Sequence, residues 1–114
     1  MHELPVTQNL MDIAIQYAEQ AGATRIRNLY ITIGDLSSII DDSIQFYWDI
    51  ISKDTIAEGA HLQFTRIPIL MHCQVCEYDY QPEDGISTCP LCDGAHVKVV
   101  AGQEFFLDSI DVDR

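Results

Sequence analysis

Two closely spaced pairs of cysteines constrain the fold of this chain more than any other feature. Two residues separate the cysteines within each pair, and 12 residues separate the pairs. A two-residue spacing lets one tight turn direct both sulfur atoms at a single ion, and two such turns complete the tetrahedron that zinc accepts. Four sulfur ligands leave no open coordination position, so the pattern predicts a structural zinc. The expected ligands are Cys73, Cys76, Cys89 and Cys92.

Other uses of these residues stay open. An iron–sulfur cluster is the second choice for four thiolates, whereas a redox pair is disfavoured because the paired spacing leaves no cysteine spare. His72 adjoins the first pair and His96 follows the second by four residues, so each is either a surface imidazole or an alternative zinc ligand. His61 is expected to face solvent. Between the pairs, residues 82–85 are typical of a turn, with room for a short strand on either side.

The cysteine-containing segment differs in composition from the rest of the chain. Residues 72–101 hold all four cysteines and few apolar side chains, which indicates a lobe held by metal. The sequence predicts an α+β fold: a small mixed sheet of about three strands with two helices, residues 1–71 and 102–114, and a zinc-ribbon-like lobe, residues 72–101, inserted before the last strand. The expected elements are helices over 4–21 and from about 41 to 53, and strands over 27–33, from 59 onward and over 104–112.

Both helices and the first strand carry an apolar face. An aromatic stripe at helical spacing, such as the one that contains Trp48, is more often core than ligand site. Pro5 is tolerated in the first turn of a helix, and Gly22 is a suitable C-terminal stop. The residues expected to face the core are Leu10, Ile13, Ala14, Tyr17, Ala18, Ala21, Leu29, Ile31, Ile33, Ile44, Tyr47, Trp48, Ile51, Leu62 and Phe64.

The charge balance narrows the functions that the chain can perform. Lys and Arg number 6 against 18 Asp and Glu, a net charge of −12. Such a surface repels phosphate backbones and suits a cation carrier or a partner with a basic face, although solubility alone also explains it. Residues 72–101 carry five acidic residues and one lysine, which weighs against the main alternative, a zinc-ribbon module that binds nucleic acid or another protein. A zinc hydrolase would need an open coordination position and a base, so no enzymatic activity is expected.

No segment indicates export or membrane insertion. The N-terminal region lacks a basic stretch followed by an apolar one. The longest apolar run, residues 67–71, is far too short to span a bilayer. We therefore expect a cytoplasmic protein without membrane contact. In that reducing compartment, four cysteines favour metal binding over disulfides.

The N-terminus is the second feature with metal-binding chemistry. The chain begins Met1-His2-Glu3, and an initiator Met before a bulky residue is expected to stay. The amine of Met1, the amide nitrogen of His2 and the imidazole of His2 can then close chelate rings around one ion. The amide or carboxylate of Glu3 can fill a fourth position. Nitrogen-rich tetragonal geometry suits Ni(II) or Cu(II).

Several motifs together resemble those of a known family. Their order along the chain is more specific than any one of them. They are the opening Met1-His2-Glu3-Leu4, the segment Ile33-Gly34-Asp35-Leu36-Ser37, Thr55 with Glu58-Gly59-Ala60 and Leu62, the two cysteine pairs, and Gly102 with Glu104. On these residues the chain resembles the HypA/HybF nickel-insertion proteins of hydrogenase maturation, over nearly its whole length.

The resemblance implies a nickel metallochaperone. It implies delivery of Ni(II) to the large subunit of a [NiFe]-hydrogenase, often with a GTPase of the HypB type, and in some organisms service to urease maturation proteins. It places the nickel role on His2, with Met1 and Glu3 beside it, and structural Zn(II) on the four cysteines. The protein would be a monomer or homodimer. Asp93-Gly94 departs from the family pattern, because Gly-Ser is more usual there, and this bears on the geometry of the second turn.

Overall fold

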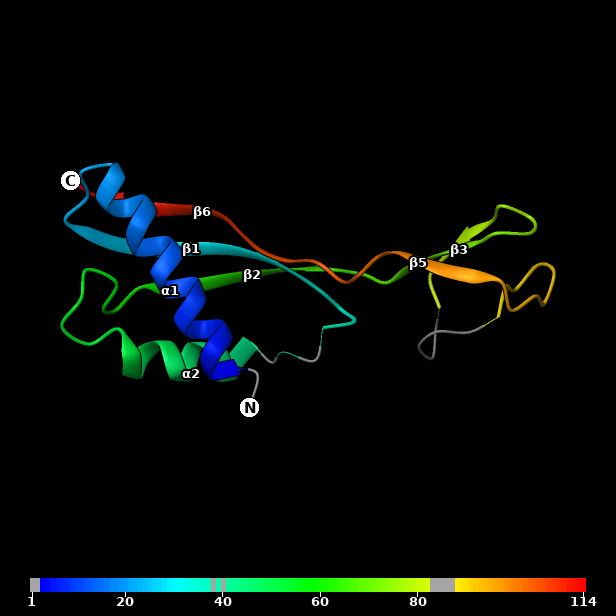
Figure 1. Cartoon of the computed structure of the whole chain (residues 1–114), viewed down its shortest axis with the longest axis horizontal. Helices are drawn as coiled ribbons and strands as arrows, with labels where there is room; N and C mark the ends of the chain where they lie inside the picture. The colour runs from blue at the N-terminus through cyan, green and yellow to red at the C-terminus, as the bar shows by residue number, and fades with distance from the viewer. Residues whose placement is uncertain (1–2, 38, 40, 83–87) are drawn as a thin grey trace. The chain divides into compact units, whose positions relative to one another are not determined.

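The computed structural model describes residues 3–37, 39, 41–82 and 88–114. The chain forms two compact units, the first made of Met1–Thr32, Ser38–Thr65 and Phe106–Arg114 and the second of Ile33–Ser37 and Arg66–Phe105. The predicted α+β class is confirmed, and the described residues form two helices and two three-stranded sheets of order β2-β1-β6 and β4-β3-β5 (Figure 1). The elements are α1 (Glu3–Gln20), β1 (Arg25–Gly34), α2 (Asp41–Ile51), β2 (His61–Ile67), β3 (Leu70–Cys73), β4 (Asp79–Tyr80), β5 (Val97–Ala101) and β6 (Phe105–Asp113).

Helix α1 ends as the sequence predicts. The amide of Gly22 donates to the carbonyl of Glu19, and the amide of Ala23 donates to the carbonyl of Ala18. This pair of bonds is a Schellman motif, which requires a left-handed residue, and Gly22 supplies it with φ of 70°. The motif satisfies carbonyl groups that the end of the helix would otherwise leave without donors. None of the helices in the described part of the chain is both long and apolar enough to cross a membrane.

The buried face of α1 is rotated from the predicted one. Leu10, Ala14 and Ala18 are buried as expected, and Thr7 and Met11 join them. The prediction for Tyr17 was wrong, because its side chain is 57% exposed. A helical stripe that passes through Thr7, Met11, Ala14 and Ala18 places Tyr17 at its border, where an aromatic ring can turn outward.

Trp48 anchors the packing of α2 in the first unit. Its side chain and that of Ile44 are fully buried as predicted, whereas Tyr47 and Ile51, the other members of the predicted stripe, are half-buried. The indole N–H donates to the carbonyl of Ala57 at 3.2 Å, so the ring is buried without an unpaired donor. Asp41 and Asp42 lie in the first turn of α2, where negative charge is favourable at the positive end of the helix dipole. Leu29, Ile31 and Ile33 on β1 are also buried as predicted.

The second unit has a small apolar core of its own. Met71 on β3 pairs with Tyr80 on β4 and with Val99 on β5. Met71, Tyr80, Cys73 and Cys89 are buried together, with Ile69, Val97 and Val99 packed against them. The lobe is therefore not held by sulfur chemistry alone. Of the two strands expected between the cysteine pairs, the described residues contain one, β4, and the turn expected at residues 82–85 lies mostly outside them.

Two glycines allow two backbone segments of the second unit to approach closely. The amide of Gly34 donates to the carbonyl of Glu104 at 2.7 Å, and the amide of Leu36 donates to the carbonyl of Gly102 at 2.8 Å. A Cβ atom on Gly34 would lie 2.0 Å from the carbonyl oxygen of Gly102. No side chain fits in that space, since both contacting groups are backbone.

We predict that Gly34→Ala destabilises the protein by more than about 3 kcal/mol, because an overlap with backbone atoms cannot relax through a rotamer change. The matched control is Gly22→Ala. Gly22 also has left-handed backbone but meets no atom within 4 Å, so only the conformational cost of about 1 kcal/mol is expected. Urea unfolding of the two variants would measure both, and equal losses of stability would contradict the close approach.

Candidate metal centre

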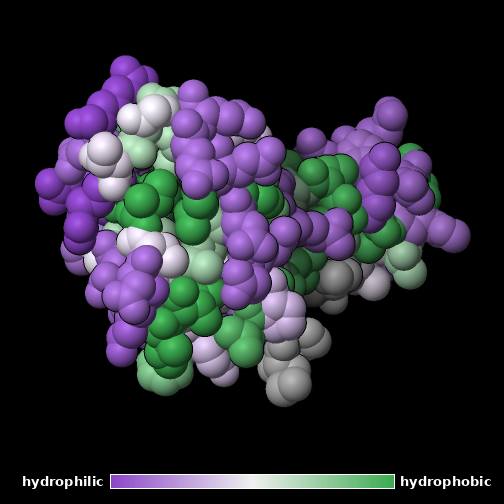
Figure 2. All heavy atoms as spheres, turned by 60° about the vertical axis from the view of Figure 1, so that its left-hand side comes forward, coloured by the Kyte–Doolittle hydropathy of each residue, from purple (hydrophilic) through white to green (hydrophobic). Residues whose placement is uncertain are grey.

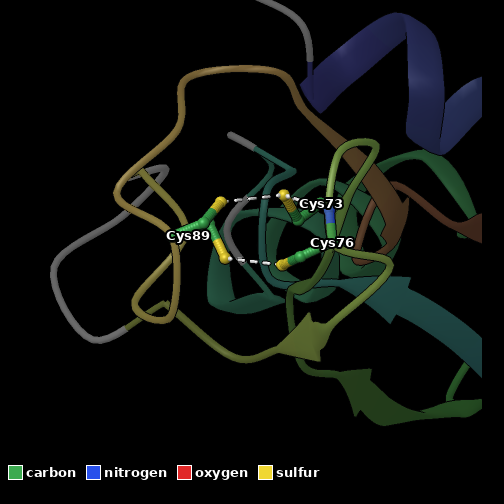
Figure 3. Close-up of side chains that lie close together, drawn as sticks. Cys73, Cys76 and Cys89 are labelled. Carbon is green, nitrogen blue, oxygen red and sulfur yellow. Dashed lines mark hydrogen bonds between the residues drawn. The ribbon is translucent and has the colours of Figure 1, made fainter.

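Four sulfur atoms converge on one point in the second unit. One ligand atom from each of Cys73, Cys76, Cys89 and Cys92 lies within 4.8 Å of all the others. The Sγ atoms of Cys73 and Cys92 are 3.5 Å apart, as are those of Cys76 and Cys89. Figure 3 shows Cys73 and Cys76 on one turn, with their sulfurs directed toward the facing segment that carries Cys89. The structure therefore brings together all four residues that the spacing selected.

The two cysteine turns have the same backbone conformation. In the first, the amide of Cys73 donates to the carbonyl of Tyr78, and the amide of Glu77 donates to the carbonyl of Cys73. In the second, the corresponding bonds run from Cys89 to Gly94 and from Asp93 to Cys89, at the same sequence separations. The first cysteine of each turn is buried and the second is exposed. The site is thus built from two copies of one turn.

An acidic residue in left-handed conformation follows each pair, a feature that we did not infer from the sequence. Glu77 has φ of 60° and Asp93 has φ of 59°. The sequence does contain a signal for this feature, because an acidic residue directly follows each cysteine pair. The departure at Asp93-Gly94 does not disturb the second turn. Asp tolerates left-handed backbone, and a Cβ on Gly94 would lie only 3.2 Å from Sγ of Cys92.

We predict that Glu77→Gly stabilises the zinc-loaded protein by about 0.5–1 kcal/mol. Relief of left-handed strain, roughly 1–2 kcal/mol for a residue with a Cβ, is partly offset by the greater freedom of glycine in the unfolded chain. Glu77→Ala removes the same charge and keeps the strain, so it serves as the control. Urea unfolding should separate the two variants, and a gain of the same size in Glu77→Ala would assign the effect to charge instead.

Two thiols of the cluster, those of Cys73 and Cys76, differ in proton affinity. The pKa of Cys73 is lowered to about 6, because the backbone N–H groups of Cys76 and then of Val75 donate to its sulfur. The pKa of Cys76 is raised to about 12, first by desolvation of its sulfur, although the residue as a whole is exposed, and then by the hydrogen bond with the neighbouring Cys89 thiol. One ligand is therefore ionised at neutral pH in the absence of metal, and another must lose a proton when the ion binds.

The donor set fits zinc. A Zn–S bond of about 2.3 Å in a regular tetrahedron places sulfur atoms about 3.8 Å apart. The two observed separations of 3.5 Å are close to that value. Four thiolates would surround zinc completely, which is the coordination of a structural site rather than of a catalytic one.

We predict that zinc binds more tightly as the pH rises. Protons compete with zinc for sulfur, and the thiol of Cys76 must lose its proton at every pH below about 12. Loss of that one proton predicts about a tenfold gain in zinc affinity per pH unit. Below about pH 6, where the thiol of Cys73 is also protonated, the dependence of zinc affinity on pH becomes steeper. Competition with a chromophoric chelator at pH 6, 7 and 8 would measure the slope. An affinity that does not change between pH 7 and 8 would contradict the protonation of Cys76.

The three histidines that the structure describes lie outside this sulfur cluster. Within the described residues, the only group of His, Cys, Asp and Glu that could hold a metal consists of the four cysteines. Nδ1 of His72 lies 2.5 Å from Oδ1 of Asp79 on the paired strand β4. His61 and His96 are exposed. Met1 and His2 fall outside the described residues, while Glu3 is the first residue of α1 and its carbonyl accepts a bond from the hydroxyl of Thr7.

This geometry defines a class: a small metal-binding α+β protein with a four-cysteine lobe. The family model for HypA, described as a metallochaperone of hydrogenase and urease nickel incorporation, matches residues 1–112. The chain is similar to the hydrogenase maturation factor HypA of Dehalococcoides mccartyi, with 38% identity over 113 residues that cover 99% of this chain and 95% of that protein. It is also similar to HypA of Caldanaerobacter subterraneus subsp. tengcongensis, with 35% identity over 114 residues that cover 99% and 100%.

Solved structures agree on the fold. The solution structure of the Ni metallochaperone HypA from Helicobacter pylori superposes with a TM-score of 0.66 at 20% identity, covering 99% of this chain and 98% of that one. A second solution structure, of a HypA protein, gives a TM-score of 0.72 at 20% identity over 98% and 96%. On its sequence, the chain belongs to the HypA family of nickel metallochaperones for hydrogenase and urease. The family carries metal and is not a family of enzymes.

Proposed function

We propose that the chain binds Ni(II) as cargo at its N-terminus and helps to insert it into the large subunit of a [NiFe]-hydrogenase. The observation that carries the proposal is the family match, which begins at residue 1 and so includes Met1-His2-Glu3. Urease maturation is the second client that we consider, because the family description names both enzymes.

The proposed nickel ligands follow from the chemistry of the first three residues. The amine of Met1, with the amide and imidazole nitrogens of His2, would form fused chelate rings, and Glu3 would supply the remaining donor. Nitrogen donors of this kind favour a tetragonal ion such as Ni(II). Because the ligands are consecutive residues at one end of the chain, the ion can be transferred without breaking the core of the first unit.

Zinc would serve a different purpose at a different site. We propose that Cys73, Cys76, Cys89 and Cys92 hold one Zn(II) that stabilises the lobe of residues 72–101, while residues 1–71 and 102–114 form the nickel-binding part. The soft sulfur donors prefer zinc, and the nitrogen donors of the N-terminus prefer nickel. The free thiols suit a reducing compartment such as the cytoplasm.

The partners follow from the same family and from charge. We propose a hydrogenase large subunit and a GTPase of the HypB type, each meeting the chain through a basic surface, since the net charge of this chain is −12. The same charge argues against nucleic acid, which was the alternative for a zinc ribbon. The proposed oligomeric state of the carrier is a monomer or a homodimer.

We predict that His2→Ala abolishes specific Ni(II) binding while zinc content and fold stay unchanged. The substitution removes the one imidazole of the chelate, and a change outside the core usually alters stability by less than about 0.5 kcal/mol. An uncleaved N-terminal tag should also weaken binding, because it converts the amine of Met1 into an amide. Nickel titration of the wild type and both forms at one pH is the measurement.

His61→Ala is the matched control, since His61 is an exposed imidazole outside the proposed site. It should bind nickel like the wild type. If His2→Ala also binds nickel like the wild type, the N-terminal site is wrong, and His61, His72 and His96 become the candidates.

A further inference from the structure

The outer edge of the first unit contains a cavity that neither metal site uses. Its volume is about 240 Å³, and it is lined by Tyr17 of α1 and by Leu107, Asp108, Ser109 and Ile110 of β6. Strand β6 is at the end of the β2-β1-β6 sheet, so one side of it faces no other strand in the described part of the chain. Figure 2 shows apolar side chains at the surface among hydrophilic ones. The ring of Tyr17 is exposed.

The two edges of this sheet differ. On β2, the amide of Leu62 donates to the side-chain oxygen of Gln45 at 3.1 Å, so α2 covers part of that edge. On β6, half-buried and exposed residues alternate from Phe105 to Val112 except at Asp108 and Ser109, which are both exposed. This slip places both Asp108 and Asp111 where they bond to side chains of β1. The β6 edge thus combines a partly apolar cavity with two fixed carboxylates.

Hydrogen bonds from side chains of β1 hold two carboxylates of this edge in place. Asp108 accepts from the hydroxyl of Thr32 at 2.7 Å, and Asp111 accepts from the hydroxyl of Tyr30 at 2.6 Å. Both donors are neutral, so they hold the carboxylates in place without balancing their charge. In the described residues, the third carboxylate of the strand, that of Asp113, does have a cationic partner, Arg27, at 2.6 Å.

We propose that this β6 surface, formed by Tyr17 and residues 107–111, binds an extended segment of a partner protein that carries an apolar side chain next to Lys or Arg. The apolar side chain fills the cavity against Tyr17, and the basic residues face Asp108 and Asp111. An extended segment at a sheet edge is a common mode of peptide recognition, in which alternate side chains give the specificity.

The charge of the strand selects this occupant over a second copy of the chain. Strand β6 contains three aspartates and no lysine or arginine. Pairing two copies of β6 would gather six carboxylates in one small area, and like charges across neighbouring strands are destabilising. A segment with alternating apolar and basic residues meets the same surface with opposite charge.

The test uses a fluorescein-labelled peptide of nine residues in which lysine and valine alternate, and a matched peptide with glutamate in place of lysine. Binding to the full-length, zinc-loaded protein is followed by fluorescence anisotropy. We expect the lysine peptide to bind and the glutamate peptide not to bind. Tyr17→Lys should weaken the binding at least about tenfold, because it puts a like charge at the apolar contact.

The matched control is Phe46→Lys. Phe46 on α2 is 60% exposed, close to the 57% of Tyr17, and it does not line the cavity. Both variants change the net charge equally, so general attraction between an acidic protein and a basic peptide would weaken equally in both. We expect less than about a twofold effect for Phe46→Lys. Circular dichroism should show that both variants keep the wild-type fold.

Three results would overturn the proposal. Equal weakening of peptide binding in both variants would show general electrostatic attraction without a specific binding site. A larger effect of Phe46→Lys would move the contact to α2. Sedimentation velocity could show that the wild type is a dimer and that Tyr17→Lys is a monomer. The surface would then be an interface between two copies of the chain. Amide shifts of residues 107–111 on adding the lysine peptide would instead support the proposed contact.

Discussion

The meeting of four sulfur atoms at one point is the constraint on which the second unit depends. Two of the sulfurs, on Cys73 and Cys89, are buried in the same small core as Met71 and Tyr80. A bound cation would neutralise thiolates that could not otherwise lie together in an apolar environment. The same ion would join the end of β3 to the segment before β5. Apolar packing and metal binding therefore act on the same residues.

The first unit is stabilised by other means. Its helices bury apolar faces, and Trp48 fills the centre with its N–H satisfied by Ala57. Burying one large side chain contributes roughly 2–3 kcal/mol, so this unit needs no ion to order it. The division suits a carrier: the proposed nickel ligands belong to the end of a stable α+β unit, while zinc would only maintain the lobe. Loading and release of cargo need not disturb the structural metal.

The sequence predicted those parts of the structure that depend on local pattern. The cysteine spacing identified all four members of the cluster, and the apolar spacing located the burial of Ile44 and Trp48. It failed where the outcome depends on contacts between distant segments. The exposure of Tyr17 reflects how α1 is rotated against its neighbours, and the contact of Gly34 with Gly102 joins residues far apart in the chain. The nickel role of Met1 and His2 stays a prediction, because both residues lie outside the described part of the chain.

Zinc removal followed by residue-resolved NMR tests the central claim most directly. The protein would be labelled with ¹⁵N and compared before and after treatment with a strong chelator under reducing conditions. We expect amide signals of residues 72–101 to collapse toward unfolded positions, while those of α1, α2 and β1 keep their dispersion, and we expect added zinc to restore the spectrum. Retention of a fully dispersed spectrum without metal would contradict the account, since apolar packing around Met71 and Tyr80 would then suffice to fold the lobe.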